Sequence, residues 1–224
     1  MSSTGLFVIC TVPPLLFGLW AQLQVRRTFK HYSQVPTAFG LTGAQAAEAV
    51  MRNAGVSGVG IRPVEGQLSD HYDPRSRTLN LSPDVGQAAT VAALGVAAHE
   101  AGHAVQDARG YKPMRIRQTL VPAATIGSQL WFLPVVFGFI IGSLGLVNIG
   151  LILFLAVVVF QLVTLPVEFD ASRRALVALE GGGLLGATEL DGARAVLRAA
   201  ALTYVAALAA SIGQLIYFFA ASRR

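Results

Sequence analysis

The sequence predicts a mostly α-helical membrane protein, with about four transmembrane helices and a small α+β domain that contains a short antiparallel sheet. Of its 224 residues, 54% are hydrophobic and only 13% are charged, whereas charged residues make up about a quarter of an ordinary soluble domain. Three long stretches contain no charged residue, namely 1–25, 118–167 and 199–222. Because a span needs about 20 apolar helical residues, these stretches have the length of membrane spans.

The uncharged stretches have room for four spans. We expect them at residues 5–23, 120–141, 146–165 and 199–221. The first span contains Pro13 and Pro14, which should kink it. It lacks the basic start and the small-residue cleavage site of a signal peptide, so we expect it to be retained as an anchor. Small and polar residues near Ser143 should form the turn between the second and third spans.

The charges predict an orientation and exclude some partners. Four spans place both termini on one side and the loops 26–117 and 166–198 on the other. These loops hold eleven and four Lys or Arg, against two at the C-terminal end. Because basic residues are enriched in cytoplasmic loops, we expect a multi-pass protein of the cell (inner) membrane with both loops in the cytoplasm. The net charge of +5 forms no stripe with aromatic residues, which argues against a nucleic-acid partner.

The first loop, residues 26–117, contains the signals of a small folded domain. Thr42 followed by Gln45 is a capping-box pattern, which predicts the start of a helix. Three short strands separated by turn residues should form a small antiparallel sheet, with the last strand offering an edge to an extended peptide. We expect these strands at residues 59–64, 68–72 and 78–81.

A helix expected over residues 83–109 carries the candidate site. His99 and His103 are one turn apart on one face, so their imidazoles can bind one divalent ion. Glu100 can reach a water molecule that such an ion activates, take its proton and later deliver it to a leaving amine. The pattern predicts hydrolysis of a peptide bond, with Zn2+ as cofactor and a polypeptide as substrate. A buried structural pair of histidines is the competing interpretation.

A catalytic zinc ion typically has three protein ligands, so two histidines are too few. His31 and His71 are lone histidines in polar surroundings. Glu168 and Asp170 directly follow a predicted span, where charged residues are often functional. They are two positions apart and face different sides of a helix, so we expect only one of them to bind the ion.

Longer segments around these residues carry a family resemblance. They are residues 71–75, 81–82, 96–107, 165–175 and 196–204. Through them nearly the whole chain resembles the YugP-type membrane zinc metallopeptidases. It is more distantly similar to the HtpX and CAAX prenyl protease group of gluzincins, in which a Glu on a later helix is the third zinc ligand. The resemblance implies a zincin-like catalytic domain on the cytoplasmic side, with Glu100 as general base. It also implies the zinc ligands His99, His103 and Glu168.

The chain departs from that more distant group at one position. The group has an Asp four residues after the ligand Glu, where this chain has Ser172. Asp170 or Asp107 could support a histidine ligand instead. In gluzincins a His or Tyr often stabilises the oxyanion, and the candidates for that role here are His71, Tyr72 and Tyr111.

Two alternative functions are compatible with the sequence. A site-2-type intramembrane protease would use Asp191, within Leu190-Asp191-Gly192, as the third ligand. A non-enzymatic membrane scaffold with a structural zinc would not need Glu100. We favour a membrane-embedded zinc endopeptidase, with its site near the bilayer surface, that cleaves membrane or membrane-adjacent polypeptides. Such a protein would be surrounded by the lipid bilayer. A membrane-protein partner or a homo-oligomer is also compatible with the sequence.

Overall fold

The structure is a computed structural model, and it describes residues 3–66 and 69–222. Leu68, which we predicted in a strand, and the C-terminal Arg223 and Arg224 lie outside the described residues. Within them, three helices are long and apolar enough to cross a membrane, or four if one bent pair counts as a single span. The chain divides into two compact units. Among the described residues, unit 1 comprises 3–22, 113–166 and 202–222, and unit 2 comprises 23–66, 69–112 and 167–201.

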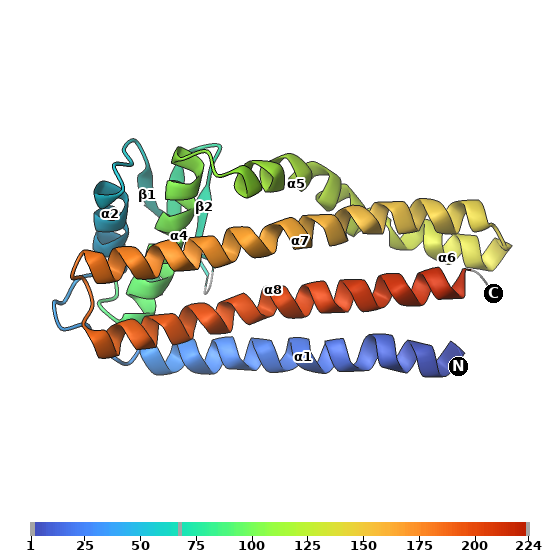
Figure 1. The fold of residues 1–224 in the computed structure, drawn as a ribbon, viewed down its shortest axis with the longest axis horizontal. Helices are drawn as coiled ribbons and strands as arrows, with labels where there is room; N and C mark the ends of the chain where they lie inside the picture. The colour runs from blue at the N-terminus through green and yellow to red at the C-terminus, as the bar shows by residue number, and fades with distance from the viewer. Residues whose placement is uncertain (1–2, 67–68, 223–224) are drawn as a thin grey trace. The chain divides into compact units, whose positions relative to one another are not determined.

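The long helices extend beyond the predicted spans, because adding residues to an existing helix is cheap compared with starting one. They are α1 (Ser3–Tyr32), α5 (Lys112–Leu130), α6 (Phe132–Ile141), α7 (Leu144–Gly181) and α8 (Ala187–Ala221) (Figure 1). The segment 120–141 is not one straight helix, since α5 and α6 are bent by 40° at their junction. The third span, expected at residues 146–165, does not end as a helix before Pro166: α7 continues through this proline, because a long helix tolerates the loss of one hydrogen bond.

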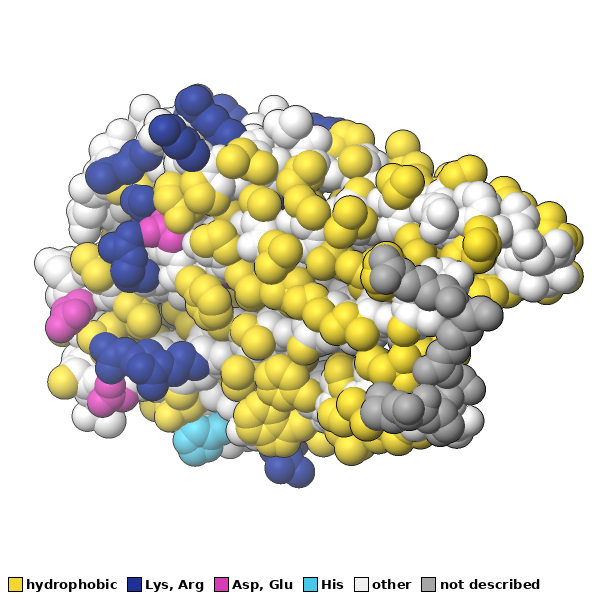
Figure 2. Space-filling view, turned by 45° about the vertical axis from the view of Figure 1, so that its right-hand side comes forward, with side chains coloured by type: hydrophobic (Ala, Val, Ile, Leu, Met, Phe, Trp, Pro, Cys, Tyr) yellow, Lys and Arg dark blue, Asp and Glu magenta, His cyan; other side chains and the backbone are white. Residues whose placement is uncertain are grey.

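In unit 1, helices approach one another closely where glycine replaces a side chain. A Cβ atom at Gly150 would lie 2.6 Å from the Trp131 carbonyl oxygen, and one at Gly213 would lie 2.3 Å from the Cys10 carbonyl oxygen. Small residues at such contacts are typical of helix packing in lipid. Large hydrophobic side chains such as Ile140, which is 72% exposed, remain on the surface, and Figure 2 shows how much of one face is hydrophobic. Lipid-facing helices have this character.

Unit 2 contains the shorter elements. They are α2 (Gly43–Asn53), β1 (Gly60–Pro63), β2 (His71–Asp73), β3 (Thr78–Leu81), α3 (Pro83–Gly86) and α4 (Val91–Ala108) (Figure 1). The predicted capping box is confirmed: Gln45 N donates to Thr42 Oγ1 at 3.3 Å, and Thr42 N donates to Gln45 Oε1 at 2.9 Å. The helix α4 contacts α2, α3, β2 and β3, so it lies at the centre of this unit.

The prediction of a purely antiparallel sheet is wrong. The sheet is mixed, with strand order β1-β3-β2, where β2 pairs antiparallel and β1 pairs parallel to β3. The turn signals in the sequence describe only consecutive strands, whereas β1 joins the far side of β3. Consequently the strand Thr78–Leu81 is central and offers no edge to a peptide. The edges belong to β1 and β2.

The single helix predicted over residues 83–109 is interrupted between α3 and α4. Thr90 is the N-cap residue of α4, since its Oγ1 accepts a hydrogen bond from Ala93 N at 3.3 Å. Just before it, the Ala89 carbonyl oxygen accepts a hydrogen bond from Thr37 N at 3.1 Å. The backbone of this segment is therefore committed to a distant part of the chain, and it cannot continue a helix.

Candidate metal centre

The helix α4 holds the two histidines in a small-residue environment. His99 and His103 lie one turn apart, with their ring centroids 4.8 Å from each other. The alanines around them on α4 are all buried: Ala97, Ala98, Ala101 and Ala104. Because these side chains are short, other segments of unit 2 can come close to the backbone of the histidine-bearing helix.

The helix α7 packs closely against α4 beside the histidines. A Cβ atom at Gly102 would lie only 2.7 Å from the Ala171 carbonyl oxygen, a distance that real Cβ atoms do not reach. Glycine at this position therefore allows the backbone of α7 to rest directly on α4. Glu168 is one helical turn before Ala171, so the same contact brings its carboxylate beside the histidine pair.

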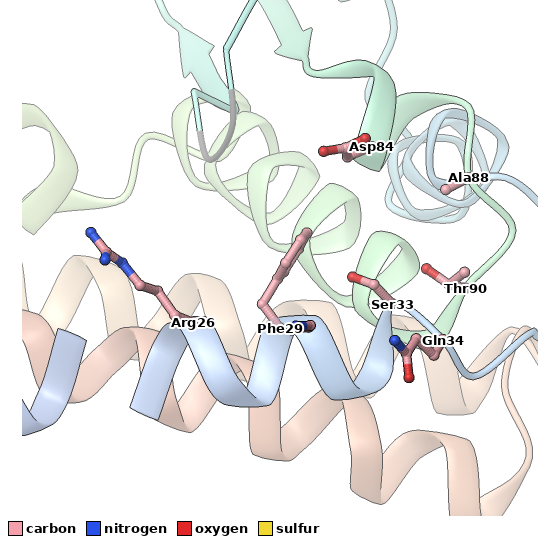
Figure 3. Close-up of a pocket in the computed structure, with 8 residues that line it drawn as sticks. Arg26, Phe29, Ser33, Gln34, Asp84, Ala88 and Thr90 are labelled. Carbon is pink, nitrogen blue, oxygen red and sulfur yellow. The ribbon is translucent and has the colours of Figure 1, made fainter. Parts of the chain in front are cut away.

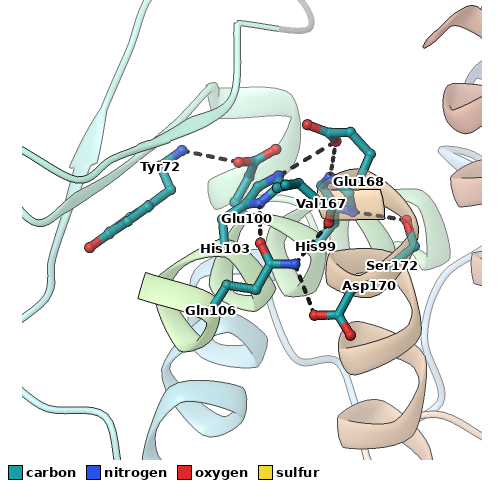
Figure 4. Close-up of polar contacts among 9 residues, drawn as sticks. All are labelled: Tyr72, His99, Glu100, His103, Gln106, Val167, Glu168, Asp170 and Ser172. Atoms are coloured by element: carbon teal, nitrogen blue, oxygen red, sulfur yellow. Dashed lines mark hydrogen bonds and ion pairs between the residues drawn. The ribbon is translucent and has the colours of Figure 1, made fainter. Parts of the chain in front are cut away.

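The three predicted ligands converge. Glu168 Oε2 lies 3.1 Å from His99 Nε2 and 3.5 Å from His103 Nε2. Their candidate ligand atoms all lie within 4.8 Å of one another (Figure 4). Glu168 is only 2% exposed. Catalytic zinc sites use donor sets of this kind, two imidazole nitrogens and one carboxylate oxygen, so the three residues fit this ion.

The other nitrogen of each imidazole also has a partner. His99 Nδ1 lies 3.1 Å from Ser172 Oγ, and His103 Nδ1 lies 3.0 Å from Gln106 Oε1. Such bonds at Nδ1 fix the ring orientation and leave Nε2 for an ion. Ser172, which stands where the HtpX and CAAX prenyl protease group has an aspartate, therefore contacts His99 at Nδ1. Gln106 is the corresponding partner of His103.

Gln106 connects the two ligand-bearing helices. It is fully buried, and its Nε2 donates to the Val167 carbonyl oxygen at 2.8 Å and to Asp170 Oδ2 at 2.9 Å. Asp170 in turn forms ion pairs with Arg173 and Arg174. Sequence reasoning assigned no role to Gln106. The available signal was its place three residues after His103, on the same face of the helix.

Glu100 is held on the side of the strands. It is buried, and its Oε2 accepts a hydrogen bond from the backbone N–H of Tyr72 in β2 at 3.0 Å. Burial raises the pKa of Glu100, although the charges of His99 and His103 oppose this shift. A carboxylate with a raised pKa accepts a proton more readily, which suits a general base. Burial alone would lower the pKa of His103, but its hydrogen bond with Glu168 and the nearby carboxylates raise it.

The three oxyanion candidates lie in different surroundings. The Tyr72 hydroxyl donates to Asp107 at 2.9 Å, and burial together with this bond raises the pKa of Tyr72 to about 12. His71 is exposed on β2. The Tyr111 ring lies 5.7 Å from the Arg174 guanidinium carbon. None of them belongs to the metal-binding group found among the described residues, and an oxyanion role for any of them stays a prediction.

The remaining candidates lie elsewhere. Asp191 is exposed and forms an ion pair with Arg194 at 2.5 Å. His31 packs edge-on against Tyr32, with ring centroids 4.7 Å apart. Within residues 3–66 and 69–222, neither side chain joins the group formed with His99. The geometry therefore gives no support to the site-2-type alternative.

A histidine pair with an adjacent glutamate, joined by a carboxylate from a later helix, is the arrangement of a metal-dependent hydrolase. The chain belongs to the zinc metallopeptidase family described as "putative neutral zinc metallopeptidase", which matches residues 7–223. It is 41% identical over 213 residues to the "putative membrane protease YugP" of Bacillus subtilis (strain 168), which covers 95% of each chain. No solved structure matches the chain. The resemblance to the YugP-type membrane zinc metallopeptidases is confirmed, and a peptidase family implies a polypeptide substrate.

Proposed function

We propose that the chain is a membrane-embedded, zinc-dependent endopeptidase that hydrolyses membrane or membrane-adjacent polypeptides. Membership of a zinc metallopeptidase family supports zinc and a polypeptide substrate. The Bacillus subtilis relative is named a membrane protease, and this name together with the three candidate spans among the described residues supports the membrane location. The observation that carries the proposal is the convergence of His99, His103 and Glu168 beside the buried Glu100.

His99 and His103 would hold the zinc ion through Nε2, and Glu168 would hold it through a carboxylate oxygen. Zinc bound there would supply a Lewis acid that lowers the pKa of a water molecule toward about 7 and polarises the substrate carbonyl. The bonds of Ser172 and Gln106 to the Nδ1 atoms hold both imidazoles in place. This support limits the reorganisation needed during the reaction.

Glu100 performs the proton transfers. Its Oε2 is held by the Tyr72 N–H, which leaves Oε1 to take a proton from the attacking water. The same oxygen then delivers that proton to the nitrogen of the leaving amine. Burial keeps bulk water away and makes the carboxylate more basic. A positioned base of this kind contributes a factor of about 10²–10⁴ to the rate.

The topology is part of the proposal. The basic loops 26–117 and 166–198 favour a multi-pass protein of the inner membrane, with the active site on the cytoplasmic side. A protease-cleavable tag inserted at the exposed Glu65 tests this in spheroplasts. The tag should be cut only after the membrane is broken, and cleavage in intact spheroplasts would contradict the orientation.

The decisive experiment measures bound zinc and peptide cleavage in parallel on the purified full chain. The Glu100→Gln variant should keep its zinc and lose about 10²–10⁴-fold in cleavage rate, because the base is removed while the ligands remain. Glu180→Gln, a change at an exposed position of the ligand-bearing helix α7, is the matched control and should leave both values unchanged.

Two outcomes would contradict the proposal. Wild-type cleavage by Glu100→Gln would show that this carboxylate is dispensable, as a scaffold with a structural zinc predicts. Equal cleavage of soluble unfolded chains and of membrane-embedded substrates would contradict the substrate class while leaving the peptidase activity intact.

A further inference from the structure

Unit 2 contains a cavity whose lining residues do not include the histidine pair. Its volume is about 570 Å³, within the usual size range of ligand sites. It is lined by the last turns of α1, by α3 and by the segment that leads to α4 (Figure 3). None of its lining residues takes part in the proposed peptidase chemistry, so the proposed function does not account for this cavity.

One wall of the cavity carries two positive charges. Arg26, Phe29 and Lys30 line it at spacings of three and four residues, which places them on one face of α1, and Ser33 follows directly after the end of this helix. Like charges four residues apart destabilise a helix. Among the described residues, no carboxylate forms an ion pair with either cation. The two charges are therefore available to an anion.

Further polar groups complete the cavity. The Ser33 Oγ atom is buried and has no hydrogen-bond partner within the described part of the chain, so a rotation of this side chain toward the cavity would supply an uncommitted hydroxyl donor near the cations. Asp84 of α3 lines another wall, with its carboxylate directed across the space in Figure 3. The cavity thus offers separate positive and negative groups, which matches a ligand that carries a phosphate and an ammonium.

The position along the chain indicates the source of such a ligand. Arg26 is the first charged residue after an uncharged stretch of 25 residues, and the helix Thr4–Tyr32 is a candidate span. Charged residues at the end of a span lie at the level of the lipid head groups. Phe29 adds an aromatic wall of the kind enriched at that level.

We propose that this cavity binds the head group of an amine-bearing phospholipid, with the chemistry of phosphatidylethanolamine. Arg26, Lys30 and the Ser33 hydroxyl hold the phosphate. Asp84 accepts hydrogen bonds from the ammonium. The cavity is then a lipid site that is separate from the metal centre, and it belongs to the membrane-embedded protein whether or not that protein cleaves peptides.

The test is a titration of the delipidated full chain in detergent, read by native mass spectrometry. The probes are phosphatidylethanolamine, phosphatidylglycerol and soluble phosphoethanolamine. Arg26→Gln and Lys30→Gln should each weaken binding of phosphatidylethanolamine by about 5-fold. Arg27→Gln is the matched control, because Arg27 is an adjacent exposed cation that does not line the cavity. Circular dichroism checks that each variant keeps its helix content.

Asp84→Asn tests the ammonium subsite separately. The wild type should bind phosphatidylethanolamine more tightly than phosphatidylglycerol, and Asp84→Asn should abolish that preference. An equal loss of binding in Arg27→Gln would overturn the proposal in favour of general surface attraction. Equal affinity of the wild type for both lipids would overturn the amine assignment. Binding of phosphoethanolamine as tight as that of the lipid would show that the cavity takes a soluble phosphate.

Discussion

Replacing Gln106 by alanine should weaken zinc binding although no proposed ligand is removed. The change deletes the contact at His103 Nδ1, at 3.0 Å, and the donor to the Val167 carbonyl oxygen, at 2.8 Å. Losing a partner that orients a metal-binding histidine typically lowers metal affinity by about 10–100-fold. The buried Val167 carbonyl also loses its side-chain donor, which should lower the free energy of unfolding by about 1–3 kcal/mol.

The assay is competition for zinc against a chelator of known affinity, together with urea unfolding of the zinc-free protein. Gln106→Glu separates the two effects. Its carboxylate can still accept the His103 N–H, so zinc affinity should stay close to that of the wild type. It cannot donate to Val167, and it faces the like charge of Asp170, so stability should fall. Gln87→Ala, at an exposed position of the same unit, is the control.

One result would refute this reasoning. If Gln106→Ala bound zinc within about 2-fold of the wild type while its unfolding free energy fell, the residue would only join α4 to α7. The hydrogen bond at His103 would then have no influence on the metal, contrary to the usual effect of such partners.

Glu168→Ala should abolish stoichiometric zinc binding, whereas Asp191→Ala should keep it; the reverse pattern in a metal assay would favour the intramembrane alternative. Gly102→Val should force α4 away from the Ala171 carbonyl and lower the free energy of unfolding by about 1–3 kcal/mol, and an unchanged urea midpoint would contradict the close contact. Tyr72 has a pKa raised from 10.0 to about 12. Its hydroxyl therefore contributes stability that is complete below pH 10 and is lost as the pH rises toward 12. The melting temperatures of the wild type and Tyr72→Phe should therefore converge between pH 10 and about pH 12. A constant difference between them would contradict a stabilising role of the protonated Tyr72 hydroxyl.

Features that depend on nearby residues could be predicted from the sequence. The capping box at Thr42 and the one-turn separation of His99 and His103 follow from spacing alone. Three of the four predicted spans correspond to helices of sufficient length and hydropathy, and the segment 120–141 does so only if the bent pair of α5 and α6 counts as one span. Proposing Glu168 as the third ligand needed a family resemblance, because no local pattern distinguishes it from Asp170.

Features that depend on distant pairing could not be predicted. The parallel pairing of β1 with β3 leaves no turn signature, since the two strands are not consecutive. The interruption before α4 depends on Thr37, 52 residues away from Ala89. Likewise, Ser172 contacts His99 across 73 residues of chain. Such contacts are specified by the packing of whole helices, and hydrophobic periodicity does not report them.

The alanines that surround the histidines on α4 have a consequence for the entropy of the site. Alanine has no side-chain rotamers to lose on folding. Ordering Ala97, Ala98, Ala101 and Ala104 around the metal ligands therefore costs backbone entropy alone. Larger hydrophobic residues would bury more area there but would also have to be immobilised. The histidines are thus held by a helix whose neighbouring side chains have a single conformation, and the distance between the two imidazoles depends little on thermal motion of the surrounding groups.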